Sequence, residues 1–288
     1  MVRHRSSGSS GGDLDVSPTV RRVPARRPPA RRVRPMRGVL VTGGSRGIGR
    51  AVARAFAAGG DRVAVQYAGR RADAERTLRE LPGTGHALLR ADLGEPGAAE
   101  RLAAEAVAAL GTVDVLVNNA AVAPTAETRH PVAETPLAHW QQVWRRMVDV
   151  NLLGAADLSW AVARHLVDRG ANGAIVNVGS RGAFRGEPDF PAYGATKAAL
   201  HALGQSLAVA LAPHGITVTS VAPGFVATER QTAKLSGPEG ERLRAESPFG
   251  RVGTPEEIAA TVHFLASPAA VWASGTVVDL NGASHLRT

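Results

Sequence analysis

Short apolar runs alternate with amphipathic stretches from residue 37 to the end of the chain. Runs of this kind predict buried β-strands, and the longer amphipathic stretches predict helices. The expected strands cover 38–42, 62–67, 86–92, 113–117, 174–180, 216–221 and 275–280. The expected helices cover 47–58, 70–81, 96–110, 137–169, 193–211 and 255–265. Alternating strands and helices imply right-handed crossovers, so we predict an α/β fold: one doubly wound parallel sheet of about seven strands with helices on both faces.

The first 35 residues differ in composition from the rest. They hold nine Arg and two Asp among many Ser, Gly and Pro, and they contribute +7 of the net charge of +9. Such a segment cannot bury a core, so we expect 1–35 to be a disordered tail and 36–288 to be one domain. The tail either contacts acidic partners or is a translation-start artefact, because Met36 opens the folded pattern directly. Since the remaining residues are nearly neutral, we expect no nucleic-acid partner.

Composition also excludes several kinds of site. The chain has no Cys, which excludes disulfides, thiolate catalysis and Cys-based zinc sites. Its nine His lack metal-ligand spacing, so no metal is expected. No apolar run reaches the ~18 residues of a membrane span, and the basic N-terminus lacks the apolar region of a secretory signal. We therefore expect a cytoplasmic protein without a membrane partner.

A glycine-rich loop, residues 42–49, joins the first expected strand to the first expected helix. Gly43 suits a tight turn, Gly47 a close backbone approach, and Gly49 close packing of helix on strand. Free N–H groups at the helix start would face a pyrophosphate. The other candidate cofactor contacts in the loop are Ser45, Arg46 and Ile48. The alternative is a glycine-rich turn that binds no ligand.

The end of the second expected strand lacks the acidic residue that usually binds the ribose 2′-hydroxyl of NAD. Tyr67 stands at that position, and neither neighbour is acidic. Basic residues lie nearby, with Arg46 in the loop and Arg70 and Arg71 beyond the strand. Guanidinium groups suit a 2′-phosphate, so we expect NADP(H) rather than NAD(H), with Tyr67, Arg46 and Arg70 in contact. Alternatively, Arg70 and Arg71 are merely solvated.

Tyr193 and Lys197 are four residues apart in an expected helix, so their side chains share one helical face. An ammonium beside a phenol favours the phenolate, so we expect the Tyr193 pKa to fall from its usual ~10. The chain has only two lysines, Lys197 and Lys234, among 34 basic residues, which suggests a specific use for the ammonium. Ser180 ends an expected strand, where open α/β sheets bind ligands. The alternative is a surface pair at i and i+4 on a solvated helix.

With these features in place, the chain resembles the short-chain dehydrogenase/reductase superfamily, and in particular 3-oxoacyl-carrier-protein reductases, over about residues 37–283. Motifs match in the same order along the chain. They are the TGxxxGIG loop at 42–49, Asp92-Leu93, Asn118-Asn119-Ala120-Ala121, Asn151, Ser180, the YxxxK pair Tyr193 and Lys197, Pro223-Gly224-Phe225-Val226 with Thr228, and the closing segments 251–258 and 279–282. Two positions depart from the pattern, because Ala121 and Asn281 replace the usual glycines.

The resemblance implies a single-domain Rossmann-like fold with NADPH across the carboxyl ends of the strands. In such a site Ser180 holds the substrate carbonyl, and Tyr193 donates a proton to its oxygen as hydride reaches the carbon. Lys197 lowers the Tyr193 pKa and bonds the nicotinamide ribose, while Asn151 keeps a relay water. The resemblance also implies cofactor contacts at Asp92, Leu93, Asn119, Ala120, Pro223, Gly224, Val226 and Thr228, and a homotetramer built partly on the two long helices.

Residues 181–191 join Ser180 to Tyr193 and should form a wall of the substrate pocket, with Gly182, Phe184 and Phe190 as candidate contacts. Arg181 and Arg185 suggest an anionic or carrier-linked substrate, or are only rim charges. The Gly- and Pro-punctuated segment 225–250 is expected to be a mobile lid. We expect His263, Trp140, Trp144 and Trp160 to serve packing rather than chemistry.

The sequence therefore favours NADPH-dependent reduction of a ketone or 3-oxoacyl compound to a secondary alcohol. An NAD-dependent alcohol or sugar dehydrogenase is the alternative within enzymes. A non-catalytic dinucleotide-binding module is the alternative outside them.

Overall fold

The computed structural model describes Met1 and residues 36–287, so the predicted tail lies almost wholly outside the described residues. Seven parallel strands form one sheet in the order β3-β2-β1-β4-β5-β6-β7. The strands are β1 (Gly38–Val41), β2 (Arg62–Tyr67), β3 (Ala87–Arg90), β4 (Val115–Asn118), β5 (Gly173–Val178), β6 (Ile216–Pro223) and β7 (Val277–Leu280). Strand order reverses between β1 and β4, which is where doubly wound sheets bind ligands. The predicted α/β fold is confirmed.

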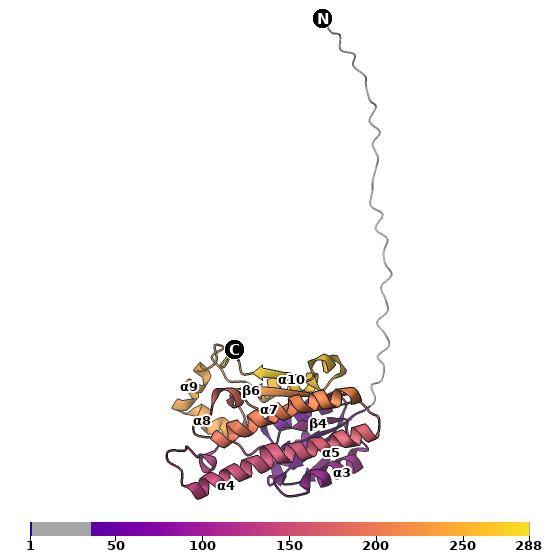
Figure 1. Cartoon of the computed structure of the whole chain (residues 1–288), viewed down its shortest axis with the longest axis horizontal. Helices are drawn as coiled ribbons and strands as arrows, with labels where there is room; N and C mark the ends of the chain where they lie inside the picture. Colours follow the sequence, from indigo (N-terminus) through magenta and orange to yellow (C-terminus); the bar gives the residue numbers. More distant parts are fainter. Residues whose placement is uncertain (2–35, 288) are drawn as a thin grey trace. The chain divides into compact units, whose positions relative to one another are not determined.

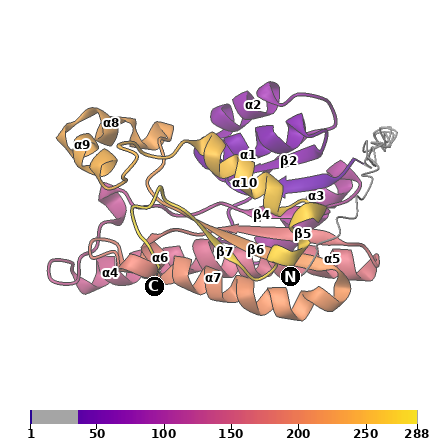
Figure 2. The same ribbon diagram turned by 90° about the horizontal axis from the view of Figure 1, so that it is seen from above.

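Helices cover both faces of the sheet (Figures 1 and 2). The main helices are α1 (Gly47–Ala58), α2 (Arg71–Glu80), α3 (Ala98–Leu110), α4 (Leu137–Val148), α5 (Gly154–Asp168), α7 (Pro191–Leu211) and α10 (Pro255–Leu265). Figure 2 shows α1, α2 and α10 on one side of the sheet, with α4, α5 and α7 on the other. Short helical segments complete the described chain: α6 (Gly182–Arg185), α8 (Thr232–Ser236), α9 (Pro238–Ala245), η1 (Ala126–Thr128), η3 (Ala212–His214), η4 (Glu229–Gln231) and η5 (Pro268–Ala273).

Side-chain alternation along the strands divides the core into two layers. Val39 and Val41 of β1 pack with α1 and α10, whereas Leu40 between them packs with α3 and α5. The five inner strands are buried on both faces, as is usual in parallel sheets, whereas the edge strands β3 and β7 are partly exposed. This rigid core fixes the carboxyl ends of β1, β4, β5 and β6, from which the site is built.

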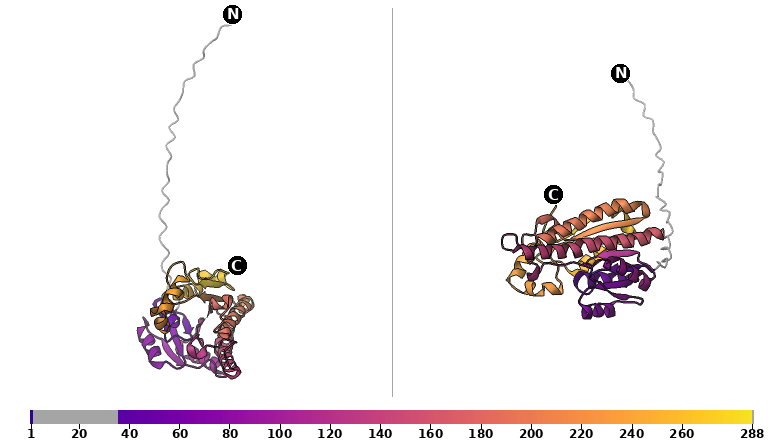
Figure 3. Two further views of the ribbon diagram at one scale, coloured as in Figure 1. Left: turned by 90° about the vertical axis from the view of Figure 1, so that its left-hand side faces the viewer. Right: turned by 60° about the horizontal axis from the view of Figure 1, so that its bottom comes forward.

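The expected helix over 137–169 is a rod with a π-helical turn inside it. The π segment η2 (Asp149–Leu153) separates α4 from α5. Such a turn adds one residue to the helical repeat and is common at functional sites. In the right-hand view of Figure 3, this rod and α7 run alongside one another, and α7 contacts both α4 and η2.

The segment after β6 contains η4, α8 and α9. Gly237 separates α8 from α9, which begins at Pro238, at the break predicted for the lid. We call residues 229–246 the lid segment. The described residues include no helix long and apolar enough to cross a membrane.

Candidate active site

A cleft of about 680 Å³ opens at the carboxyl ends of the strands. Most of the predicted site residues line it. They are Gly43, Ser45, Arg46, Gly47, Ile48, Gly49, Arg70, Asp92, Leu93, Asn119, Ala120, Ser180, Phe190, Tyr193, Lys197, Pro223, Gly224, Val226 and Thr228. Four predicted residues do not line it: Tyr67, Asn151, Gly182 and Phe184. The cleft therefore joins the predicted phosphate loop to the Ser180–Tyr193–Lys197 group.

The glycine loop has the backbone that its sequence predicts. Gly43 and Gly47 have φ of +63° and +55°, a region that L side chains rarely adopt. A Cβ on Gly49 would lie 2.2 Å from the Gly43 carbonyl oxygen, so no larger residue fits there. Asn119 closes the loop from β4, because its Nδ2 donates to the Thr42 carbonyl at 2.8 Å and to that of Gly43 at 3.2 Å.

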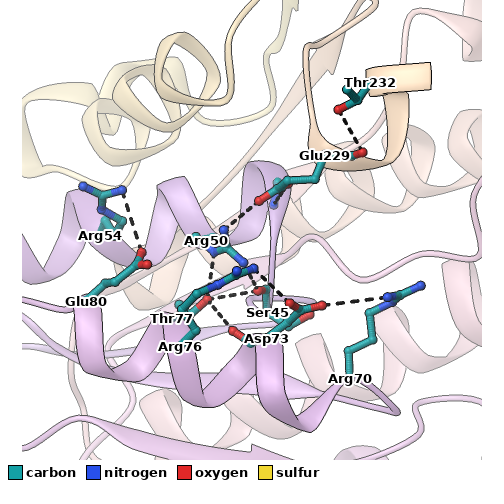
Figure 4. A network of polar contacts seen from close by, with 11 residues as sticks. Ser45, Arg50, Arg54, Arg70, Asp73, Arg76, Thr77, Glu80, Glu229 and Thr232 are labelled. Carbon is teal, nitrogen blue, oxygen red and sulfur yellow. Dashed lines mark hydrogen bonds and ion pairs between the residues drawn. The ribbon is translucent and has the colours of Figure 1, made fainter. Parts of the chain in front are cut away.

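A carboxylate from the lid segment binds the start of α1, as Figure 4 shows. Glu229 Oε2 accepts a hydrogen bond from the Gly47 N–H at 3.0 Å, and its Oε1 accepts one from Arg50 at 2.6 Å. Arg50 also donates to Ser45 O and to Thr77 Oγ1. An anion at a helix N-terminus is favourable, so Glu229 interacts with an end of α1 that also suits phosphate. The sequence reading missed Glu229, which is 182 residues from Gly47.

Three arginines lie near one another at this end of the cleft. Burial, and then the nearby charges of Arg70 and Arg230, lower the pKa of Arg46. Among the described residues no ion pair involves Arg46 or Arg230, whereas Arg70 has Asp73 at 3.8 Å. Tyr67 is buried beneath the cleft, because its side chain alternates inward on β2. Tyr67 does not line the cleft, so its cofactor contact stays a prediction, while Arg46 and Arg70 line the cleft.

Asp92 reaches the cleft, but another residue holds its carboxylate. Arg146 of α4 donates to both carboxylate oxygens at 3.0 and 2.8 Å, and Gly94 N donates at 3.0 Å. Burial opposes ionisation, but these hydrogen bonds outweigh it and lower the pKa of Asp92. Asp92 is therefore an ionised acceptor beside the cleft. Arg146, which also lines the cleft, was not found from the sequence.

Ser180 and Tyr193 meet at one end of the cleft. Ser180 Oγ accepts a hydrogen bond from the Gly182 N–H at 3.0 Å. Burial raises the pKa of Tyr193, and a hydrogen bond with Ser180 only partly offsets this. The expected fall in the Tyr193 pKa is therefore wrong for this structure, because desolvation of the phenolate outweighs the favourable interactions.

Lys197 lies beside Tyr193, as the four-residue spacing predicts. Its Nζ is 5.8 Å from the centroid of the Tyr193 ring and donates to the Val178 carbonyl at 2.7 Å. The Lys197 side chain is buried, which lowers its pKa to about 8, with the charge of Arg230 adding to the shift. The alternative of a solvated surface pair is excluded by this burial.

Asn151 lies in the π turn and does not line the cleft. Its Oδ1 accepts from Val122 N at 2.7 Å, and its Nδ2 donates to Val122 O at 3.2 Å and to Thr196 Oγ1 at 3.3 Å. These bonds join η2 to the loop after β4 and to α7. Asn151 therefore positions the cleft wall at Val122, which lines the cleft.

The predicted substrate wall is divided: Arg181, Arg185 and residues 187–190 line the cleft, whereas Gly182 and Phe184 do not. Phe184 stacks on His201 with centroids 5.3 Å apart and lies under the Arg287 guanidinium. Arg181 is buried in an ion pair with Glu246, which also holds Arg185 at 3.4 Å. Both arginines line the cleft and share this single carboxylate, so a net positive charge remains there and the anionic or carrier-linked substrate stays a prediction. Phe190 alone of the three predicted wall contacts lines the cleft.

The other aromatic predictions had mixed outcomes. Trp140 packs between His130 and Trp144, and His263 packs on Phe56. Trp160, in contrast, is 59% exposed on α5, so the packing prediction is wrong for it within one chain. The described residues hold no group of three His, Cys, Asp or Glu that could bind a metal ion.

Comparison with known proteins shows which sequences this chain is similar to. A family model described as enoyl-(acyl carrier protein) reductase matches residues 43–285. Relatives include L-rhamnose 1-dehydrogenase (NAD(P)(+)) of Sphingomonas sp., which is 37% identical over 251 residues and spans 86% of this chain and 96% of its own length. A 3-oxoacyl-[acyl-carrier-protein] reductase of Staphylococcus aureus is 35% identical over 252 residues, spanning 87% of this chain and 98% of its own.

Solved structures agree with this match. The crystal structure of a 3-ketoacyl-(acyl-carrier-protein) reductase from Brucella melitensis complexed with NADH has a TM-score of 0.77 and 28% sequence identity. The similarity covers 87% of this chain and 98% of that one. The chain therefore shares both fold and sequence with proteins whose names describe NAD(P)-dependent oxidoreductases.

Proposed function

Since the chain belongs to the short-chain dehydrogenase/reductase family and is an NAD(P)-dependent oxidoreductase, we propose a specific reaction for it. The enzyme reduces a carbonyl compound to a secondary alcohol with NADPH. The observation that carries the proposal is the meeting of Ser180, Tyr193 and Lys197 in the cleft that also contains the glycine loop. Bound NADPH would supply the hydride.

The protein groups have distinct proposed roles. Ser180 donates a hydrogen bond to the carbonyl oxygen, and Tyr193 donates the proton that this oxygen gains as hydride arrives at carbon. Lys197 is held beside Tyr193 by Val178 O, and we assign it contact with the nicotinamide ribose. Donors aimed at a developing alkoxide stabilise the transition state, and losing one costs ~10²–10³ in rate. Asn151 acts through its bonds to Val122, and its predicted relay water stays a prediction.

The shape and charge of the cleft fit a dinucleotide phosphate. Only glycine is tolerated where the loop folds against itself at Gly49. Arg46, Arg70 and Arg230 supply positive charge beside it, and such charge favours the 2′-phosphate of NADP. The relatives do not decide between the cofactors, because the L-rhamnose enzyme is named for NAD(P)(+) and the Brucella structure contains NADH.

A second candidate is oxidation of a sugar in the reverse direction. It is supported by the L-rhamnose 1-dehydrogenases among the relatives, at 37% and 38% identity. Both candidates use the same residues, because hydride transfer is reversible and Tyr193 then accepts the proton. We further propose a homotetramer, and a cytoplasmic location stays a prediction.

The test is a substrate panel with the purified full chain. NADPH oxidation is followed with plain ketones, hydroxy ketones, β-ketoesters and a 3-oxoacyl thioester, and NADP⁺ reduction with sugars. Titration with NADPH and NADH measures the two dissociation constants, in the wild type and in Arg46→Ala. We expect turnover of at least one carbonyl class, and a preference for NADPH that weakens about tenfold in Arg46→Ala, as for one charge-assisted contact. Protein that binds NADPH tightly but reduces no carbonyl compound would contradict the proposal.

A further inference from the structure

Six carboxylates line the cleft: Asp92, Glu187, Asp189, Glu229, Glu239 and Glu246. Five of them form ion pairs. Asp92 pairs with Arg146, Asp189 with Arg129, and Glu229 with Arg50. Glu239 pairs with Lys234 and Arg242, and Glu246 with Arg181 and Arg185. Within residues 36–287, Glu187 is the exception, because neither an ion pair nor a hydrogen bond engages its carboxylate. Glu187 is half-buried and lines the cleft, so its carboxylate is an acceptor that no protein group occupies and that a ligand in the cleft could use.

The chain holds Glu187 beside the reacting group. Its Oε1 lies over Gly182, where an added Cβ would be 2.3 Å from that oxygen, and its Cβ packs against Gly194. Gly182 donates its N–H to Ser180 Oγ at 3.0 Å, and Gly194 follows Tyr193 in the chain. The carboxylate therefore lies between the segments that carry the two hydroxyls of the site. Two glycines leave room for it, which also explains why Gly182 does not line the cleft.

The chemistry of the surroundings selects the kind of group that Glu187 can bind. A carboxylate accepts hydrogen bonds and repels anions. Nine basic side chains line the same cleft against six carboxylates, so its net positive charge disfavours a cationic ligand group. Burial raises the pKa of Glu187 despite Arg185 and Arg181 nearby, which agrees with a carboxyl group poorly solvated by water. A neutral hydroxyl satisfies all of these conditions.

We propose that Glu187 accepts a hydrogen bond from a substrate hydroxyl adjacent to the reacting carbon, so that the enzyme acts on hydroxy ketones and, in reverse, on vicinal diols and sugars. The inference rests on the proposed carbonyl–alcohol chemistry and names its substrate class. A 3-oxoacyl thioester has no hydroxyl beside its ketone and leaves Glu187 without a donor. Glu187 thus determines specificity and takes no part in bond making.

The step is balanced without any further reactant. The carbonyl carbon gains a hydride from NADPH, which becomes NADP⁺, and the carbonyl oxygen gains the proton of Tyr193. Solvent returns a proton to Tyr193, and the adjacent hydroxyl and Glu187 leave the step unchanged.

The experiment compares matched substrates that differ by one hydroxyl. We measure kcat/KM with NADPH for 3-hydroxybutan-2-one and butan-2-one, and with NADP⁺ for butane-2,3-diol and butan-2-ol. A hydrogen bond to a charged group corresponds to a factor of ~10–100. We therefore expect the wild type to prefer the hydroxylated member by at least about tenfold. Glu187→Leu should remove that preference, and Glu187→Gln, which keeps an acceptor, should retain part of it.

The controls separate specificity from folding. The Kd for NADPH should stay within about threefold in both variants, which shows that they fold and bind cofactor, and specificity is measured as the ratio of kcat/KM for the hydroxylated and plain substrates within each variant. Glu241→Gln, which removes an exposed carboxylate of α9 outside the cleft, should leave the preference intact. Two outcomes would overturn the role of Glu187 and leave the proposed function intact. One is a wild type that prefers the unhydroxylated ketone or the thioester, and the other is a Glu187→Leu enzyme with an unchanged preference. Absence of turnover on every carbonyl compound would overturn the proposed function itself.

Discussion

At the scale of single residues, burial decides the protonation of the α7 side chains that lie along one face. Lys197 and His201 are four residues apart, and both are buried. Burial lowers the pKa of Lys197 to about 8 and, together with the charge of Lys197, lowers that of His201 from its ordinary 6.5 to about 4. The His201 ring rests on Gly179, where a Cβ would lie 2.1 Å from it. His201 is therefore a neutral packing group behind Ser180.

This burial predicts acid sensitivity with a definite sign. Between pH 6.5 and about 4 the unfolded chain binds a proton at His201 that the folded protein does not, so stability falls as the pH falls through this window. The loss at pH 5 relative to pH 7.5 is about 2 kcal/mol from this group. Urea unfolding at both pH values should show a smaller difference in His201→Leu than in the wild type. His214→Leu, at an exposed site, is the control, and equal pH dependence in all three proteins would refute the assignment.

The same residues show what sequence can and cannot provide. The four-residue spacing was sufficient to place Lys197 beside Tyr193, because helical geometry is local. It gave the wrong direction for the Tyr193 pKa, because burial depends on residues far away in the chain. Glu187 and Arg230 were missed for a related reason. The sequence shows that a loop residue is charged, but only the structure shows whether that residue lies in the cleft and whether an opposite charge pairs with it.

At the scale of elements, the lid segment and α1 are joined through one side chain. Glu229 binds both the Gly47 N–H and Arg50, at the helix end where a pyrophosphate is expected. Figure 4 shows that Arg50 continues this network to Ser45 and Thr77. A phosphate bound there would meet the negative charge of Glu229 or displace it.

Neutralising Glu229 should therefore strengthen cofactor binding. We expect Glu229→Gln to lower the Kd for NADPH by about twofold to fivefold, the size of a charge effect at a helix end. Fluorescence titration at low and high salt measures this, and the difference should shrink at high salt. Glu239→Gln, on the same lid segment but paired with Lys234 and Arg242, is the matched control. An increase in Kd for Glu229→Gln would show that the carboxylate supports cofactor binding.

The bounds of a helix could be predicted where the spacing of its apolar residues is regular, and less well where the helical repeat changes. The sequence predicts α1 at 47–58 and α10 at 255–265 with the observed bounds. It predicts one uninterrupted helix over 137–169, because the π turn at Asp149–Leu153 contains no proline or glycine to mark it. That turn places Asn151 against Val122, and the relay water expected at Asn151 stays a prediction.

At the scale of the whole molecule, the long helices expose apolar side chains. Trp160 of α5 and Val209 of α7 are 59% and 79% exposed, and Leu153 of η2 is also exposed. Contiguous exposed apolar patches mark protein–protein contacts, and the homotetramer proposal requires that these side chains contribute to one such patch. This distribution supports the proposed homotetramer, in which these helices would pack against those of other subunits.

A charge introduced at Trp160 should break this assembly. We expect sedimentation velocity to give a tetramer for the wild type and a smaller species for Trp160→Glu, because a buried unpaired carboxylate is costly. Trp160→Phe keeps an aromatic ring and should remain tetrameric. A monomeric wild type, or a tetrameric Trp160→Glu, would count against these helices as the interface.

The central claim is that Tyr193 protonates a carbonyl oxygen during hydride transfer from NADPH, and single-turnover kinetics test it most directly. The NADPH complexes of wild type and Tyr193→Phe are mixed with the best substrate of the panel, and NADPH absorbance is followed. The account predicts a loss of about 10²–10⁴-fold in the single-turnover rate, typical of removing a general acid, with the Kd for NADPH changed by less than about threefold. A Tyr193→Phe enzyme that oxidises bound NADPH at the wild-type rate would contradict it.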